Sequence, residues 1–156
     1  MNLCDFAENK PDAVARIIGG EEAPQLSGCV RFYQEGGCVL IVADISGLPK
    51  TSETGFFRFH IHQGKECSGA GFSGTEGHYN PLGRGHPEHA GDLPPLLSCR
   101  GNAYLSIKTD RFSVNEINGR TVVVYSDSDD FCTQPAGNAG KKFACGVVRM
   151  RRVVKS

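Results

Sequence analysis

All five histidines of this 156-residue chain lie between residues 60 and 89, and an aspartate follows the last of them by three residues. Imidazole nitrogens together with a carboxylate are ligands that zinc and copper commonly use in proteins. The clustering therefore constrains the fold, because the chain must bring this window together if these residues act as one set. The candidate ligands are His60, His62, His78, His86, His89 and Asp92.

The first two histidines lie in residues 55–62, where polar and apolar side chains alternate. Alternation predicts a strand, because successive side chains of a strand point to opposite faces. The core face would hold Phe57, Phe59 and Ile61. The outer face would hold Arg58, His60 and His62. The two imidazoles could clamp a metal, or they could be unrelated surface histidines, since a lone His-x-His is a weak motif.

The second group, His78, His86, His89 and Asp92, lies in a segment rich in glycine and proline. Such residues exclude a long regular element there. A tetrahedral ion held by three nitrogens and one carboxylate oxygen could order the loop, since four ligands match the coordination number that zinc prefers. The alternative is a loose polar loop with incidental histidines.

Six stretches of the chain, in the same order, resemble the copper/zinc superoxide dismutases. They are FRFHIHQG (57–64), GHYNP (77–81), HPEHAGDLPPL (86–96), GRTVVVY (119–125), DDF (129–131) and GNAGKKFACGVV (137–148). The alignable region runs from about Asp12 to near the C-terminus. On these stretches the chain is identified as a bacterial-type member of the family with an altered copper site.

The resemblance implies a role for each candidate ligand. The residues that match copper ligands are His60, His62 and His78. The residues that match zinc ligands are His78, His86, His89 and Asp92. His78 thus matches the histidine that bridges the two metals, so both zinc and copper are implied cofactors.

The resemblance also implies residues around the ligands. Asp129 matches an aspartate that hydrogen-bonds a copper histidine and a zinc histidine together, and such partners fix ring orientation and ligand basicity. Cys67 and Cys145 match the pair that forms the intrasubunit disulfide, which ties the metal loop to the last strand.

Two positions depart from the family's pattern. The fourth copper ligand of the family is a histidine, and here that position is Tyr125. A phenol, with a pKa of about 10, binds a metal only if the metal displaces its proton. Lys142 stands where the family has an arginine beside the copper channel, and lysine lacks the planar fork that orients a small anion. The sequence therefore predicts an intact zinc half and an incomplete copper half.

The catalytic residues implied by the resemblance are His78 and Lys142. In the family's cycle the bridging histidine leaves copper when the copper is reduced. Because Tyr125 replaces a ligand, only His60 and His62 would then hold the ion. We therefore expect weak superoxide dismutation.

The rest of the chain favours an all-β fold, since it has 20 glycines, 8 prolines and no convincing amphipathic helix. We expect one domain over residues 1–156, with an N-terminal extension at 1–11, folded as an eight-stranded antiparallel Greek-key barrel or sandwich. The expected strands are 13–18, 28–34, 38–46, 55–62, 103–109, 112–117, 120–126 and 144–152. The sequences at 35–37 and 118–119 predict turns. The long connections 63–102 and 126–143 are expected to be functional loops, for metal ligation and a substrate channel.

The chain has seven cysteines, and the odd number leaves at least one free. Apart from the implied disulfide, the remainder are expected to be free thiols, several of them buried. These are Cys4, Cys29, Cys38, Cys99 and Cys132. If Glu35-Gly36 forms the hairpin loop, Cys38 faces Tyr33 and does not pair with Cys29.

The charge balance and hydropathy restrict the partners. Seventeen basic and seventeen acidic residues give a net charge of zero, which does not favour nucleic acid. No segment has the length or composition of a membrane span or of a secretory signal. We expect a cytoplasmic protein, or a processed exported form, that acts on superoxide or another small anion, with a homodimer as the candidate assembly.

Three functions remain open at this point. The first is a copper/zinc superoxide dismutase. The second is a zinc-stabilised relative with little or no dismutase activity. The third is a copper-handling protein. The sequence shows no metal-delivery domain with a Cys-x-x-Cys motif, which counts against this third function.

Overall fold

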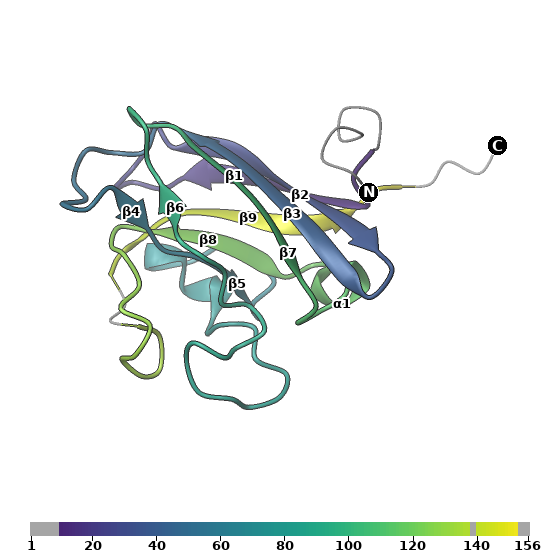
Figure 1. The fold of residues 1–156 in the computed structure, drawn as a ribbon. Helices are drawn as coiled ribbons and strands as arrows, with labels where there is room; N and C mark the ends of the chain where they lie inside the picture. The colour runs from purple at the N-terminus through teal and green to yellow at the C-terminus, as the bar shows by residue number, and fades with distance from the viewer. Residues whose placement is uncertain (1–9, 138–139, 153–156) are drawn as a thin grey trace.

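The structure, a computed structural model, describes residues 10–137 and 140–152. Within them, seven antiparallel strands form one curled sheet in the order β5-β8-β9-β1-β2-β3-β7, and β4 and β6 form a small second sheet (Figure 1). The strands are β1 (Ala13–Gly19), β2 (Ser27–Glu35), β3 (Cys38–Ser46), β4 (Phe56–Phe57), β5 (Phe59–His62), β6 (Leu96–Leu97), β7 (Ala103–Thr109), β8 (Thr121–Tyr125) and β9 (Lys142–Met150). The expected all-β Greek-key fold is confirmed. In the sheet, β1 lies between β9 and β2, so the last strand of the chain pairs with the first.

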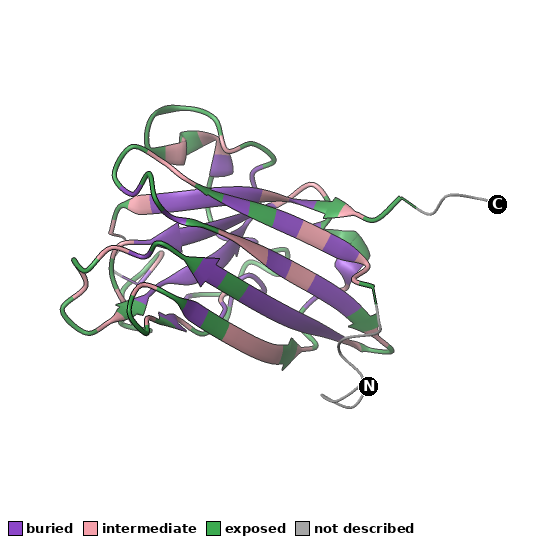
Figure 2. Ribbon diagram, turned by 90° about the horizontal axis from the view of Figure 1, so that it is seen from above, coloured by how far each residue is buried: buried purple, intermediate pink, exposed green. Residues whose placement is uncertain are grey.

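The concave side of the curled sheet holds the core. Side chains alternate between buried and exposed along several strands, as the bands of colour in Figure 2 show. The buried residues of one large cluster come from all seven strands of the sheet or pack against it, and they include Phe32, Ile41, Phe59 and Val122. Burial of this apolar surface provides the main driving force for folding.

The hairpin between β2 and β3 differs in register from the expectation. Glu35 pairs with Cys38, so the loop is formed by residues 36 and 37, and Cys38 does not face Tyr33. Glu35 is thus the last residue of β2. Relative to the expected loop at residues 35 and 36, this shift of one residue changes the partner of every residue in the hairpin. Cys29 pairs with Asp44, so Cys29 and Cys38 are not bonded to each other, as expected.

The segment expected as a strand at 112–117 is instead a short helix, α1 (Val114–Ile117). Ser113 and Glu116 form a capping box, in which the Glu116 carboxylate accepts a hydrogen bond of 2.6 Å from the Ser113 backbone N–H. This Ser-x-x-Glu signature satisfies backbone donors that a helix start leaves open. Val114 and Ile117, three residues apart, then share one buried face. The prediction was wrong because the capping signal outweighed a short apolar pattern.

The expected strand at 55–62 is divided into β4 and β5, with Arg58 between them. β4 pairs with β6, whereas β5 pairs with β8, so the chain crosses from one sheet to the other at Arg58. A second unexpected element lies in the connection that follows β5, the 3₁₀ helix η2 (Ala70–Thr75).

Four of the five cysteines expected to be free are described, and all four are free thiols. Cys29 and Cys38 are half-buried, and Cys99 and Cys132 are exposed, so the expectation that several are buried is wrong for these four. Cys4 and most of the expected N-terminal extension lie outside the described residues. Among the described residues, no helix is both long and apolar enough to span a membrane.

Candidate metal centre

Two histidines of the site come from a sheet strand. His60 and His62 lie on β5, on the face opposite Phe59 and Ile61, which pack in the core. They were expected to face outward, and they do face away from the core, but both are buried. The reason is that the two long connections fold back over this face of the sheet (Figure 1).

The loop that carries the other ligands is fastened directly to β5. The Ile61 backbone N–H donates to Gly91 O at 2.9 Å, and Ile61 O accepts from the Tyr79 N–H at 2.9 Å. A Cβ on Gly91 would lie 2.1 Å from Ile61 O, so this close approach requires glycine. The main chain therefore fixes where His78 and Asp92 stand relative to the β5 histidines.

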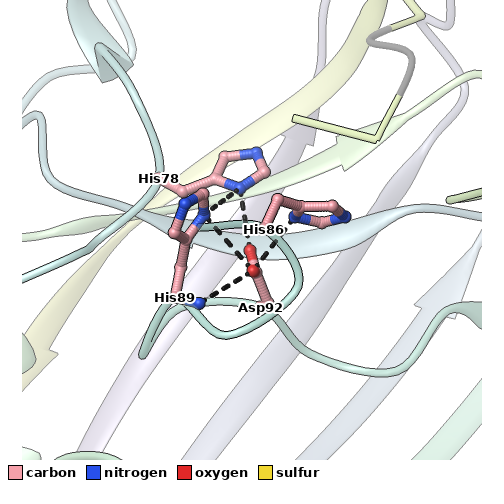
Figure 3. Close-up of side chains that lie close together, drawn as sticks. All are labelled: His78, His86, His89 and Asp92. Atoms are coloured by element: carbon pink, nitrogen blue, oxygen red, sulfur yellow. Dashed lines mark hydrogen bonds and ion pairs between the residues drawn. The ribbon is translucent and has the colours of Figure 1, made fainter. Parts of the chain in front are cut away.

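Four of the predicted ligands converge on one point, as Figure 3 shows. One donor atom from each lies within 4.8 Å of all the others, and the four residues are His78, His86, His89 and Asp92. Asp92 is at the centre: its Oδ1 lies 2.8 Å from His78 Nδ1, and its Oδ2 lies 3.0 Å from His86 Nδ1 and 3.2 Å from His89 Nδ1. Three imidazole nitrogens and one carboxylate oxygen are a donor set that suits tetrahedral zinc.

The protonation of His86 shows that this set fits a cation. His86 Nε2 lies 2.8 Å from Asp129 Oδ1, and the carboxylate can only accept, so Nε2 carries the proton. His86 Nδ1 then presents a lone pair toward the Asp92 carboxylate, and it is buried with no hydrogen-bond partner. Two acceptors that face each other in a buried site are stabilised by a positive ion between them. The four residues therefore fit zinc.

Asp129 joins the two halves of the centre. Its Oδ1 binds His86, and its Oδ2 lies 3.0 Å from His60 Nε2. Burial opposes ionisation of Asp129, but hydrogen bonds from His60, the Phe131 backbone N–H and His86 outweigh it and hold the pKa of the carboxyl well below its ordinary value. A charged Asp129 orients both rings, so that His60 Nδ1 and His86 Nδ1 are the nitrogens left for metal.

His78 stands between the two halves. Its Nδ1 faces Asp92 in the zinc set, and its Nε2 lies 3.1 Å from His60 Nδ1. The ring centroids of His60 and His78 are 4.3 Å apart in an edge-to-face arrangement. The two nitrogens of one ring thus point at two different donor groups, as a bridging ligand requires. Burial lowers the pKa of His60 to about 4, which keeps this ring neutral.

Tyr125, at the position of the family's fourth copper ligand, is hydrogen-bonded to His62. The Tyr125 hydroxyl lies 2.8 Å from His62 Nε2, while His62 Nδ1 lies 2.8 Å from the backbone oxygen of Glu76. The Glu76 carbonyl can only accept, so Nδ1 carries the proton and Nε2 accepts from the phenol. Burial raises the pKa of Tyr125 well above its ordinary value, so the phenol stays protonated. Tyr125 therefore donates to the nitrogen through which His62 would bind copper.

Lys142 reaches the same side of the site from the start of β9. Its Nζ donates to Thr75 Oγ1 at 2.7 Å and to Phe72 O at 3.5 Å, both in η2. Partial burial lowers the pKa of Lys142. The lysine is therefore tied to the metal loop, with its charge close enough to contribute to the lowered pKa of His62.

The disulfide implied by the resemblance is present. Cys67 and Cys145 are bonded, with their Cα atoms 5.7 Å apart and a sequence separation of 78. The bond attaches the connection after β5 to β9. Cys145 also packs beside Tyr125 and Val123, so the disulfide anchors the loop next to the copper half.

Three residues around the centre were given no role by the sequence. The Gln134 side chain holds the His86 main chain on both sides, accepting from its N–H at 2.9 Å and donating to its carbonyl at 2.6 Å. Arg111 donates to the carbonyls of three residues of the zinc loop, at 3.1–3.3 Å. Arg58 contacts the 126–137 segment. No local pattern marks Gln134 or Arg111, but Arg58 is a charged residue flanked by apolar ones, Phe57 and Phe59, and this was an available signal.

The comparisons with known proteins agree with this geometry. A sequence model of the family "Copper/zinc superoxide dismutase (SODC)" matches residues 26–148. Cu-Zn superoxide dismutase 2 of Aquifex aeolicus is 35% identical over 152 residues, covering 88% of this chain and 86% of that protein. The Cu-Zn superoxide dismutase of Paramecium bursaria Chlorella virus 1 is 32% identical, covering 94% of this chain and 83% of that protein. The rat extracellular enzyme is 33% identical, covering 81% of this chain and 56% of that protein. The chain belongs to the copper/zinc superoxide dismutase family.

Proposed function

We propose that this chain is a zinc-binding member of the dismutase family that dismutates superoxide slowly, at a copper site weakened by Tyr125. Zinc would be held by His78, His86, His89 and Asp92. Copper would be held by His60, His62 and His78. The observation that carries the proposal is the contrast between the two halves: the four zinc donors converge on one another, whereas His62 Nε2 accepts a hydrogen bond of 2.8 Å from Tyr125, a residue outside the ligand set.

The residues of the chain would prepare the site for a small anion. Copper, when bound by these residues, would supply the redox couple that dismutation requires. Lys142 provides a positive charge beside His62, which attracts the anion but orients it less than a guanidinium would. Asp129 keeps the His60 ring oriented through Nε2. We propose a cytoplasmic location, with a processed exported form as the alternative: four described cysteines are free thiols, as is usual in a reducing compartment, whereas Cys67 and Cys145 are bonded.

The test is metal analysis and dismutase assay of the wild type and of Tyr125→His, both purified in the presence of zinc and copper. We expect about one equivalent of zinc per chain in each. We expect the wild type to hold clearly less than one equivalent of copper and the variant to hold more, with a faster rate. A wild type that is already full of copper, together with an unchanged rate in the variant, would contradict the proposal.

The second candidate is a zinc-stabilised protein without catalysis. The observation that favours it is that His62 is satisfied without copper, by Tyr125 on one nitrogen and the Glu76 carbonyl on the other. This candidate predicts no copper uptake from a copper excess and no superoxide dismutation by the zinc-loaded protein. A copper-handling role instead predicts uptake of copper(I) and its transfer to an acceptor protein, again without dismutation.

A further inference from the structure

Arg58 is a fully buried arginine between β4 and β5, two residues before His60. Burying a guanidinium is costly unless hydrogen bonds and opposite charges compensate for the lost water. An arginine in this position therefore needs a set of partners that the fold supplies. Those partners are in the segment of residues 126–137, which follows β8 and covers the metal centre.

The guanidinium of Arg58 binds both ends of this segment. Nη1 donates to Ala136 O at 2.9 Å, and Nη2 donates to Ser128 O at 3.1 Å and also to Gly137 O. The Arg58 backbone N–H donates to Asp127 O at 2.9 Å. Arg58 thereby holds residues 127–128 close to residues 136–137. The residues between them form a loop whose two ends are joined through this side chain.

The same guanidinium lies next to the two residues that decide the state of the copper half. Nε of Arg58 is 3.8 Å from Asp129 Oδ2, and Cζ lies 5.2 Å from the centre of the Tyr125 ring. The Tyr125 N–H also donates to Arg58 O at 2.9 Å. Arg58 therefore acts on Asp129 in two ways, by holding the backbone of its neighbour Ser128 and by the charge beside its carboxylate.

We propose that Arg58 is a positioning residue that fastens the 126–137 segment over the metal centre and so places Asp129 between His60 and His86 before any metal binds. The planar fork of arginine can donate to several carbonyls in different directions, which a lysine ammonium on a flexible stem does less well. None of these contacts involves a metal ligand atom. The 126–137 segment is thus held in place without a metal. Zinc affinity should rise as a result, because an Asp129 that is already in position fixes the orientation of the His86 ring.

The first measurement is hydrogen exchange of the metal-free protein, in the wild type, Arg58→Lys and Arg58→Met. We expect faster exchange in peptides that cover residues 126–137 and unchanged exchange in β1, β2 and β3, with the larger effect in Arg58→Met. The matched control is Arg16→Lys, at an exposed arginine on β1, which should leave both regions as in the wild type.

The second measurement is zinc affinity by competition with a chromophoric chelator. Mutation of a residue that supports a metal ligand from outside the coordination sphere typically lowers metal affinity about 10- to 100-fold. We expect a loss of zinc affinity in that range for Arg58→Met and a smaller loss for Arg58→Lys. Asp129→Asn should reproduce the loss of zinc affinity, whereas Arg16→Lys should not. This second measurement rests on the proposed zinc site, whereas the exchange measurement on metal-free protein does not.

Two results would overturn the inference. One is unchanged exchange of the 126–137 segment in both Arg58 variants. The other is faster exchange of every strand to the same degree, because Arg58 would then support the fold in general. If Arg58→Met does not fold, the comparison of Arg58→Lys with Arg16→Lys decides between these outcomes. If the wild type itself binds no zinc, the proposed function fails, and the exchange result still tests the role of Arg58.

Discussion

The hydroxyl of Tyr125 donates a hydrogen bond of 2.8 Å to His62 Nε2, the nitrogen through which His62 would coordinate copper. The substitution of the family's histidine by tyrosine therefore has two consequences. At the proposed copper site it would remove one ligand and would also engage a second one, His62, in a competing bond. In the zinc half the partners of the donor atoms within the described part of the chain belong to the four residues themselves, such as the His89 N–H that donates to Asp92 Oδ2 at 3.1 Å, and the donors lie within 4.8 Å of one another.

Removal of the Tyr125 hydroxyl should separate these two consequences. In Tyr125→Phe the His62 lone pair is released while no ligand is added, so we expect copper affinity to rise above that of the wild type but to stay below that of Tyr125→His. Copper titration followed by electron paramagnetic resonance measures this order. The control is Tyr104→Phe, at an exposed tyrosine of β7. Equal copper binding by Tyr125→Phe and the wild type would show that the hydrogen bond does not restrain His62.

Replacement of Asp92 by alanine should release zinc and lower the melting temperature. Asp92 contacts His78, His86 and His89, and metal binding in a loop without regular structure is coupled to the ordering of that loop. Zinc content and thermal denaturation measure the effect. Asp44→Ala, at an exposed aspartate of β3, is the control. The zinc assignment is wrong if Asp92→Ala keeps both its zinc and its melting temperature.

Gly137 should tolerate no side chain. Its φ is +66°, and a Cβ there would lie 2.1 Å from Asp129 Oδ1 and 2.7 Å from His86 Nε2. We expect Gly137→Ala to displace Asp129 and to lower zinc affinity by about tenfold or more. Gly83→Ala is a matched control, because Gly83 has a similar φ of +62° but no atom within 4 Å of the added Cβ. If both variants lose affinity equally, backbone strain and not the clash is responsible.

Loss of the disulfide should destabilise the protein. The Cys67–Cys145 bond closes a loop of 78 residues, and such crosslinks contribute roughly 2–4 kcal/mol. We expect the free energy of unfolding of Cys67→Ser, measured by urea denaturation, to fall by about this amount. Cys99→Ser removes an exposed free thiol and should change it little. Identical unfolding midpoints for the two variants would argue against the stabilising role of the bond.

The metal-free protein should lose stability as the pH falls from about 6.5 to about 4. Burial lowers the pKa of His60 from 6.5 to about 4, and burial together with the charge of His78 lowers the pKa of His62 as well. In this window the unfolded chain takes up protons that the buried rings do not, so unfolding is favoured by acid. Melting temperatures measured with chelator across the range test this. His62→Gln should show a shallower decline, and a constant melting temperature in the wild type would refute the explanation.

Much of the fold and of the metal centre could be predicted from the sequence, because both depend on local signals. In β1 the buried residues Ala13, Ala15 and Ile17 alternate with more exposed ones, so a local pattern reports which side chains face the core, and seven of the eight expected strands have counterparts in the structure. The exception, α1, is only four residues long, and its capping box was a local signal that was present but not used. The identity and spacing of the zinc donors are also local, since they lie within residues 78–92.

The state of the copper half was decided only by the tertiary structure. The sequence shows that Tyr125 replaces a histidine, but the bond between Tyr125 and His62 joins residues 63 positions apart. Arg58 reaches carbonyls 70 to 79 positions away, and Gln134 reaches the His86 backbone 48 positions away. Periodicity and spacing report on neighbours in the chain, whereas these contacts exist because the curled sheet brings two long loops onto one face. Residue types therefore determined which donor groups the chain offers to metals, and packing decided which of those donor atoms other side chains already engage.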